Sequence, residues 1–399
     1  MKERNVLKSS AFTIFGLMAP GLAMAALKAP ANEITDVSVG GYIQLDAVYS
    51  SVSAGANQSA DHFFIGSSVP LDSTHGESDQ LKISARESRI WLKSGGQYEH
   101  WQLTAKLEGD FYGAKPTFSE TYNNNSDFRI RHAYLQADYD DNHSFLIGQY
   151  WSAFQNTRAF PHTTTIGTLP GQAFSRTPQI RYQYNLAYWQ LYASLENPES
   201  NLLTEQGESV RPDDDKYPDL VLGVKQKHQA GQISLSVLYR SLSCEQYQLC
   251  HDSEDAWGIS VAGEYNFDAR NQLRYQLNRG NGIGRYVSGV IYPDAVLGAQ
   301  GNLFNTRVTA GMLSFQHTWR DDLTSAVIFN YADSETQYDT SGSAVVMTDK
   351  ITTLNVNLQW WPVPEKWRLS MEVLRANTRL SSDAKGDLSR VMLSSRYYF

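Results

Sequence analysis

The chain has 399 residues, a formal net charge of -8 at pH 7, and 12% aromatic residues. Apart from one short apolar run near the N-terminus, no stretch approaches the ~20 apolar residues of a membrane-spanning helix, which excludes a helical membrane protein. The acidic, hydrophilic composition fits an exported soluble protein or a membrane β-barrel, because the polar lumen, loops and turns of a barrel dilute its lipid-facing residues.

The N-terminus predicts export. A basic stretch with Lys2, Arg4 and Lys8 precedes an apolar run over 11–22, and small residues that end at Ala25 form a cleavage site. We therefore divide the chain into a secretory signal peptide (1–25), a short N-terminal segment (26–36) and a β-barrel domain (37–399).

Alternating apolar and polar residues recur along the rest of the chain, which is the pattern of strands that face two different environments. The predicted strands, in chain order, are 41–47, 89–93, 102–108, 131–135, 145–148, 179–184, 189–193, 220–225, 233–237, 257–267, 273–278, 312–319, 325–331, 352–360, 367–373 and 390–399. They make about sixteen strands, an even number within the range of bacterial barrels. We predict an all-β protein, a transmembrane antiparallel β-barrel.

The connections between these strands alternate in length. Short links such as 140–142 and 320–322 carry turn residues, whereas polar segments such as 50–80 and 279–305 are long. Outer-membrane barrels have short periplasmic turns and long external loops. A soluble β-sandwich or propeller is the alternative fold, but it would not expose lipid-type positions such as Leu354.

The last strand ends flush with the C-terminus at an aromatic residue. Counting back from Phe399 by twos gives a mostly apolar face, and the alternate set carries Arg390 and Arg396. Bacterial outer-membrane barrels close in this way, whereas the C-terminus of a soluble protein more often frays. We expect the barrel-assembly machinery to engage this strand, and lipid and lipopolysaccharide to surround the barrel in the outer membrane.

If the apolar positions face lipid, their neighbours along each strand face the lumen. The predicted pore-lining and anion-binding cations are Arg89, Lys106, Arg131, Arg158, Arg176, Arg181, Arg240, Arg274, Arg368 and Arg390, and the acidic pore wall contains Asp46, Glu87 and Glu108. Arginine stays charged and binds carboxylates through planar bidentate hydrogen bonds, so an arginine-lined pore favours anions. Alternatively, each arginine pairs with a lumen carboxylate and only stabilises the wall.

The segment 151–178 follows the fifth predicted strand, and we predict that it is a constriction loop. It is the third external connection of a sixteen-stranded barrel, and it carries Arg158, His162, Arg176 and three phenylalanines that would pack on the inner wall. The alternative is a loop that only caps the outside.

The only two cysteines, Cys244 and Cys250, are separated by five residues. In an oxidising periplasm we expect a local disulfide that stiffens one loop, whereas a metal pair or a redox couple fits this context poorly.

Catalytic motifs do not stand out, and we predict no enzymatic activity, no cofactor and no metal. The glycine-rich stretch at 280–285 lacks the final glycine of a dinucleotide fingerprint, and no helical pattern follows it. The chain contains no H-E-x-x-H motif and no G-x-S-x-G elbow.

Several motifs resemble a known family. The residues at 89–90, 131–134 and 148–152 look like the front half of Gram-negative trimeric porins. More specific are the motifs at 170–182, 195–198, 218–221 and 282–286, which together resemble the DcaP-like porins. The resemblance covers nearly the whole mature chain and implies a sixteen-stranded homotrimeric channel for small anionic solutes, dicarboxylates among them. Some members carry a long helical N-terminal extension, whereas only about eleven residues separate the predicted cleavage site from the first strand here.

The leading hypothesis is an outer-membrane channel for passive diffusion of small solutes, with a preference for anions such as dicarboxylates. One alternative is a weakly selective general or sugar porin. A sugar channel would need a ladder of aromatic side chains in the lumen, whereas the tyrosines mostly fall on lipid-side positions. The other alternative is a structural or adhesive barrel that acts through its long loops. We expect no nucleic-acid partner.

Overall fold

The computed structural model describes residues 36–53, 62–72, 79–113, 126–165, 169–212, 214–245, 250, 252–287, 289–336, 338 and 345–399. The predicted signal peptide lies outside these residues, as does the predicted N-terminal segment except for Asp36. None of the helices in the described part of the chain is both long enough and apolar enough to cross a bilayer.

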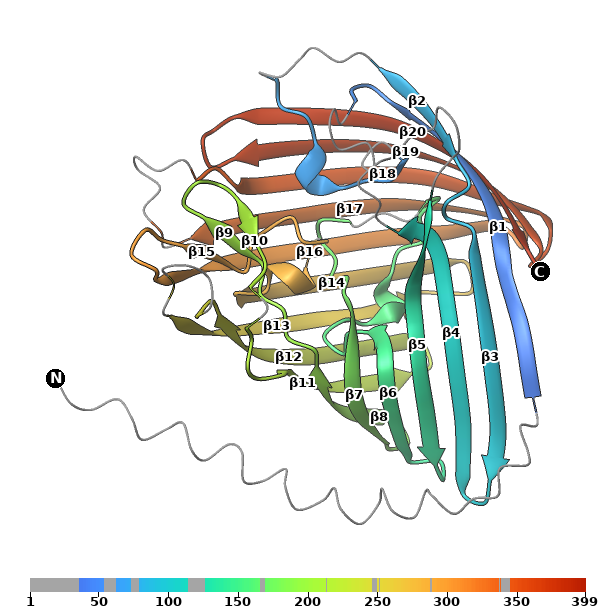
Figure 1. Ribbon diagram of the computed structural model, residues 1–399. Coiled ribbons are helices and arrows are strands. Elements are labelled where there is room, and N and C mark those ends of the chain that lie inside the picture. Colours follow the sequence, from blue (N-terminus) through green and yellow to red (C-terminus); the bar gives the residue numbers. More distant parts are fainter. Residues whose placement is uncertain are drawn as a thin grey trace.

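The described residues form one sheet that closes on itself (Figure 1), antiparallel except where β9 meets β15. Four of its twenty strands are short, and the other sixteen make the barrel wall. The wall strands are β1 (Asp36–Ser50), β3 (Arg89–Tyr98), β4 (Trp101–Gly113), β5 (Asp127–Tyr139), β6 (His143–Trp151), β7 (Arg176–Asn185), β8 (Trp189–Glu196), β11 (Asp219–His228), β12 (Gly231–Ser243), β13 (Ser253–Asn266), β14 (Asn271–Asn281), β16 (Leu303–Arg320), β17 (Leu323–Thr336), β18 (Thr348–Val363), β19 (Trp367–Leu380) and β20 (Lys385–Tyr398). The predicted barrel is confirmed.

In the described part of the chain, seven shorter elements lie in the connections between the wall strands. The short strands are β2 (Gln80–Ser84), β9 (Leu202–Thr204), β10 (Ser209–Val210) and β15 (Ala295–Leu297), and the 3-10 helices are η3 (Gly66–Ser68), η5 (Thr157–Ala159) and η6 (Gly284–Tyr286). β2 and β3 pair with successive parts of β1, so together they occupy the place of one strand in the wall.

The barrel closes between its first and last strands. β20 pairs with β1 in an antiparallel register that sets Tyr42 opposite Tyr398. Phe399 extends this pairing, because its backbone N–H and carbonyl both form hydrogen bonds with the backbone of Gly41. The C-terminal aromatic residue therefore helps to seal the barrel, as its pattern in the sequence predicted.

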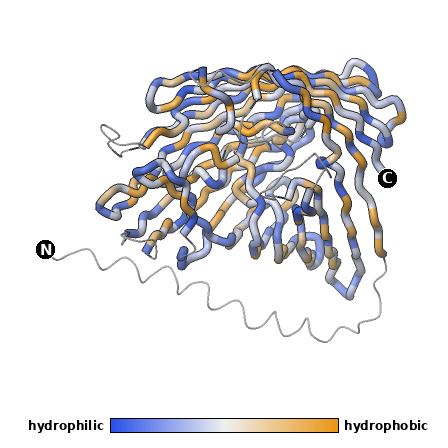
Figure 2. The backbone as a smooth tube through the Cα atoms, turned by 45° about the horizontal axis from the view of Figure 1, so that its top comes forward, coloured by the Kyte–Doolittle hydropathy of each residue, from blue (hydrophilic) through white to orange (hydrophobic). Residues whose placement is uncertain are grey.

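Hydropathy alternates along the wall strands (Figure 2). In β17, Val327 and Phe329 are 47% and 48% exposed on the outside, whereas their neighbours Ala326 and Ile328 are buried. Large apolar side chains that are exposed in the same way occur on most wall strands. They give the barrel the outward apolar band that a lipid environment requires.

Long connections lie at the end of the barrel opposite the short turns, which in outer-membrane barrels is the external end. We name those used below by their place in the chain: L1 (51–79), L3 (152–175), L4 (197–218), L5 (244–252) and L6 (282–302). L1, L3 and L6 supply residues to one apolar cluster with inward-facing wall residues, which include Val308, Ile351 and Leu374. The external half of the lumen is therefore partly filled by loops.

Candidate pore constriction

L3 runs across the lumen and reaches the opposite wall. The backbone N–H of Thr164 donates to Glu372 Oε2 on β19 at 2.8 Å, and Asn357 on β18 donates to the carbonyl of His162 at 2.7 Å. Leu169 packs in a buried cluster with Ile328 and two other wall residues. The loop that the sequence predicts over 151–178 thus folds inward, although its first and last residues belong to β6 and β7.

L3 is also fixed to the nearer wall. The side chain of Asn156 donates to Ser234 on β12 at 3.0 Å and accepts from Gln232 at 3.0 Å. Arg158 projects from η5 and pairs with Glu264 on β13, with Nε 2.7 Å from Oε1. Because its side chain is 66% exposed, Arg158 keeps part of its guanidinium open to the lumen.

A cluster of charged side chains lines β3, β4 and β5. Glu108 lies 3.4 Å from Arg89, 2.7 Å from Lys106 and 3.1 Å from Arg131. The β4–β5 pairing shifts register at Arg131, so that Glu108 lies opposite His132 and Gly109 opposite Ile130. The Arg131 guanidinium remains on the same face as Arg89, Lys106 and Glu108.

Asp110 joins the second half of this cluster. It accepts a bidentate pair of hydrogen bonds from Arg129, at 2.9 and 2.8 Å, and one from Arg131 at 2.7 Å. Asp110 is fully buried, whereas the side chain of Arg129 is 34% exposed. The two carboxylates therefore hold a larger set of cations in place on one side of the pore.

Arg176 faces this cluster from the first residue of β7. Its guanidinium lies 4.9 Å from the centre of the Trp151 ring, and that of Arg131 lies 6.0 Å from the same ring. Arg176 is repelled by the positive charges of Arg89, Arg129 and Arg131 and attracted by the carboxylate of Asp110. Among the described residues, no carboxylate forms an ion pair with Arg176.

The alternation of β7 does not by itself place Arg176 in the lumen. Arg176 shares its face of the strand with Pro178 and Ile180, which are exposed on the outside. It reaches the cluster because the backbone pairing of β5 with β6 ends at Gln149. Past this residue, the side chain of Gln149 donates a hydrogen bond to the carbonyl of Ile130 on β5. The wall opens there, and Arg176 lies beside the opening.

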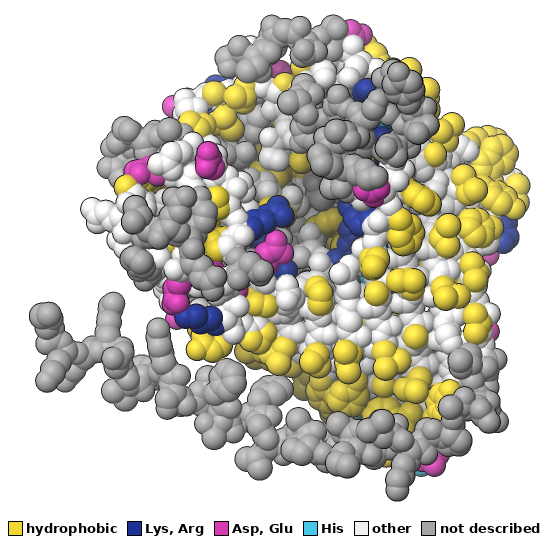
Figure 3. Space-filling model, in the orientation of Figure 1, with side chains coloured by type: hydrophobic (Ala, Val, Ile, Leu, Met, Phe, Trp, Pro, Cys, Tyr) yellow, Lys and Arg dark blue, Asp and Glu magenta, His cyan; other side chains and the backbone are white. Residues whose placement is uncertain are grey.

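A pocket of about 280 Å³ lies at this opening. It is lined by Ile130, Gln149, Phe174, Ser175, Arg176, Glu199, Asn201, Arg211, Arg285 and Val290. Three arginines thus share the pocket with one carboxylate. The hollow face in Figure 3 likewise shows dark blue cationic side chains gathered beside an acidic one.

The other predicted cations are spread around the wall. Arg181 donates to Gln179 at 2.9 Å and to the carbonyl of Trp151 at 2.5 Å. Arg274 lies 4.0 Å from Glu264, and Arg368 donates to the carbonyl of Thr164 in L3 at 3.3 Å. Arg390 is only 2% exposed on β20. Within the described residues, neither Arg181 nor Arg368 forms an ion pair with a carboxylate, although Glu196 interacts electrostatically with Arg181 and Glu372 with Arg368.

The predicted acidic residues all lie on the β1 side of the barrel seam, on β1, between β2 and β3, and on β4. Asp46 on β1 is 1% exposed and accepts a hydrogen bond from Gln44 at 2.6 Å. Glu87 pairs with Arg396 of β20 at 2.8 Å, whereas Glu108 belongs to the charged cluster on β4.

Arg240 differs from the sequence-based expectation. It faces inward on β12, as alternation predicts, but it is 1% exposed and its guanidinium is enclosed by Asp219 and Asp294. The physical reason is that L6 folds over it. Its guanidinium is therefore not open to the pore.

The sequence matches the model of the DcaP outer membrane protein family over residues 24–399. The chain belongs to this family. Its location is accordingly the outer membrane, in agreement with the closed barrel. No curated protein sequence matches it.

Solved structures share the fold of this DcaP-family protein. The outer membrane channel DcaP of Acinetobacter baumannii is 22% identical with a TM-score of 0.77, over 91% of this chain and 97% of that one. The anion-selective porin of Comamonas acidovorans is 11% identical with a TM-score of 0.58, over 91% and 99%. A trimer form of OmpT of Vibrio cholerae is 12% identical with a TM-score of 0.54, over 91% and 99%.

Three arginines of this site, Arg129, Arg211 in L4 and Arg285, were not among the predicted residues. Arg129 lies two positions before Arg131 on the same strand, so alternation could have placed it on the same face. Arg285 lies in L6, and no periodicity in the sequence indicated that this loop turns into the lumen.

Gly171 allows L3 to pack directly on the wall. A Cβ atom added there would lie 2.0 Å from the carbonyl oxygen of Gly311 on β16. Gly171→Val is therefore expected to push L3 toward the pore axis and to reduce single-channel conductance by about half. Planar-bilayer recordings would measure this, with Gly311→Ala as the control, because a Cβ there meets only contacts of 3.6 Å or more. Unchanged conductance would show that L3 absorbs the added side chain.

The structure joins Cys244 to Cys250 by a disulfide in L5. Both residues are buried in a small cluster with residues of L4 and L6, among them Leu202 and Ala295. Replacing both cysteines with serine is expected to lower the free energy of unfolding by about 2 kcal/mol and to leave ion selectivity unchanged. Thermal unfolding and reversal potentials would test this, with the reduced wild-type protein as the control. A shift in selectivity would contradict it.

Proposed function

We propose that this protein is a passive channel for small anionic solutes, dicarboxylates among them. The observation that carries the proposal is the charge of the cluster beside L3. Five cations, Arg89, Lys106, Arg129, Arg131 and Arg176, share two carboxylates, Glu108 and Asp110, which leaves a net charge of +3. The excess positive charge favours anions at the narrowest region.

The mechanism follows from desolvation. A carboxylate that passes between L3 and the charged cluster gives up part of its hydration shell in a region of low dielectric. The Arg176 guanidinium, which forms no ion pair with a carboxylate among the described residues, offers replacement hydrogen bonds in bidentate geometry. A dicarboxylate engages a second cation, such as Arg158 or Arg181, before it releases the first. Binding then stays weak and divided among sites, as conduction requires.

The surroundings of the channel form a further part of the proposal. We infer a homotrimer, supported by the family and by the trimer form of the structurally similar OmpT. The outward apolar band contacts lipid and lipopolysaccharide. The assembly machinery engages the C-terminal strand that ends at Phe399.

The test is the reversal potential of the purified protein in a planar bilayer under a salt gradient. The proposal requires a potential of the sign given by anion permeability, and a measurable current when a dicarboxylate replaces chloride. A large conductance without ion preference would replace it with a general porin. The absence of any conductance would favour a structural or adhesive barrel.

A further inference from the structure

L6 folds into the lumen and contacts both ends of L3. Near the end of L3, the backbone N–H of Phe174 donates to the carbonyl of Tyr286 at 2.9 Å, and Ala173 forms an antiparallel bridge with Val287. Near its start, the ring of Phe154 lies 5.9 Å from that of Tyr286. Any movement of L6 therefore acts on L3 from two sides.

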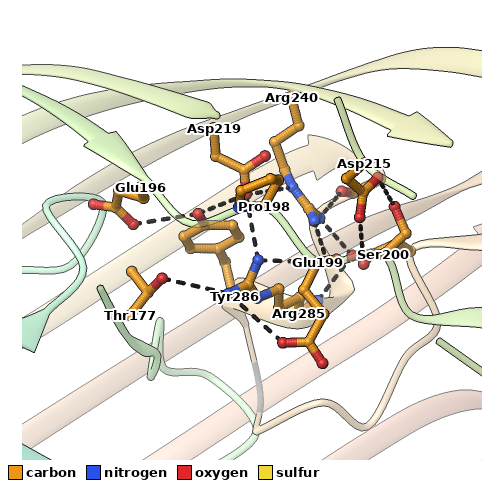
Figure 4. A network of polar contacts seen from close by, with 12 residues as sticks. Thr177, Glu196, Pro198, Glu199, Ser200, Asp215, Asp219, Arg240, Arg285 and Tyr286 are labelled. Carbon is orange, nitrogen blue, oxygen red and sulfur yellow. Dashed lines mark hydrogen bonds and ion pairs between the residues drawn. The ribbon is translucent and has the colours of Figure 1, made fainter. Parts of the chain in front are cut away.

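A buried ion cluster fixes L6 in this position. Arg240 on β12 lies 3.0 Å from Asp219 on β11 and 2.9 Å from Asp294 in L6, and it donates to the carbonyl of Gly282 at 2.9 Å. All three charged side chains are 1% exposed or less. Arg240 and Arg285 converge on Asp219 in Figure 4.

Every charge in this cluster is compensated. Asp294 also accepts hydrogen bonds from the backbone N–H groups of Arg285 and Asn201, both at 2.9 Å. Arg240 donates in addition to the carbonyl of Glu199 at 2.7 Å. Because buried ions are stable only when paired and hydrogen-bonded, movement of L6 would separate Asp294 from Arg240 and leave Arg240 with Asp219 as its one acidic partner in this cluster.

The same cluster reaches L3 directly. The Tyr286 hydroxyl donates to Asp219 at 2.8 Å and lies 3.2 Å from Glu196 (Figure 4). Glu196 in turn accepts a hydrogen bond from the backbone N–H of Ala153 in L3 at 2.8 Å. One connected set of hydrogen bonds thus joins the wall to L6 and to the start of L3.

The position of L6 bears on the constriction through Phe174. Its ring lies 4.9 Å from Trp151, the indole on which the guanidiniums of Arg131 and Arg176 also pack. L6 further contributes Arg285 to the pocket that Arg176 lines. We propose that Arg240 and Asp294 are positioning residues: they hold L6 in the lumen and thereby set the width of the pore at L3 and the place of Arg176.

The test removes the buried ion cluster by substitution and then fixes L6 to L3 with an engineered disulfide. Arg240→Gln is made in a background where Cys244 and Cys250 are serine, with and without cysteines at Ala173 and Val287. Antiparallel partners have Cα separations that a disulfide can span. We expect Arg240→Gln to raise single-channel conductance about twofold, to increase current noise and to lower anion preference. Oxidation of the added cysteine pair should restore the parental values, and reduction should reverse this.

The matched control is Arg307→Gln, which removes an exposed ion pair with Glu335 on the neighbouring strands. If Arg240→Gln does not assemble, Asp294→Asn replaces it, since it keeps the side-chain shape. Parental conductance in a folded variant would overturn the inference. A changed conductance that the oxidised cysteine pair does not restore would also overturn it, because the effect would then not pass through L6 and L3.

This inference rests on the proposed channel only for its electrical measurements. Hydrogen exchange in detergent gives an independent measurement. The variant should exchange faster over 284–297 and 152–160, and the oxidised pair should slow exchange at 152–160 again. Unchanged exchange in both segments would overturn the inference even in a non-conducting barrel. Conversely, if the wild-type channel had no anion preference, the proposed function would be wrong, but the hydrogen-exchange test of the L6 contacts would still apply.

Discussion

Replacing Arg176 and Arg181 together with glutamine is expected to lower the ratio of anion to cation permeability about fivefold, which corresponds to about 1 kcal/mol. Neither guanidinium forms an ion pair with a carboxylate among the described residues, so part of their charge is left to act on the permeating ion. Arg176 packs on Trp151, and Arg181 donates to the carbonyl of the same residue, so the two charges act at one level of the pore. Their removal leaves the wall hydrogen bonds of β7 in place.

Reversal potentials under a salt gradient measure this effect. Gel electrophoresis checks that the barrel is folded, because a folded barrel changes its mobility when the sample is heated. Arg375→Gln is the matched control, because Arg375 is half-exposed and pairs with Asp387 away from L3. The assignment of Arg176 and Arg181 to the anion path would be wrong if the folded double variant kept the selectivity of the control.

Much of the fold follows from the sequence because a barrel repeats one rule. Each wall strand alternates between lipid and lumen, so a pattern such as that of 352–360 predicts both a strand and its outer face. The apolar run of alternate residues back from Phe399 likewise predicts a closing strand. The inward-facing Ile328 shows where this rule fails. It is apolar although it faces the lumen, because Leu169 of L3 covers it.

The site was less predictable because alternation gives the direction of a side chain and not what covers it. Arg240 faces inward, but the approach of L6 encloses it between two aspartates. Arg176 lies on the outward set of β7 and reaches the charged cluster only because β5 and β6 stop pairing beneath it. These features depend on loop paths and on where neighbouring strands end, neither of which has a periodic signal.

Asp110→Asn should have the opposite effect to the arginine variant and raise anion preference about threefold. Asp110 accepts hydrogen bonds from Arg129 and Arg131, and asparagine keeps its shape while it removes the negative charge. The net charge of the cluster rises from +3 to +4, and Arg131 retains Glu108 as a partner at 3.1 Å. The cost is a less compensated buried guanidinium, which should destabilise the barrel by about 3 kcal/mol.

Reversal potentials and urea unfolding measure the two effects separately, with Asp387→Asn as the control for loss of an exposed carboxylate. A folded Asp110→Asn channel with unchanged or reduced anion preference would show that the cluster is structural and lies off the ion path. Comparing the Arg176 and Arg181 double variant with Asp110→Asn separates an effect of the charge of the cluster from an effect of the width of the pore. The glutamine variant shortens two side chains and widens the pore, whereas the asparagine variant leaves the pore the same width. Opposite shifts in selectivity therefore cannot arise from a change in diameter and would have to come from the charge of the cluster.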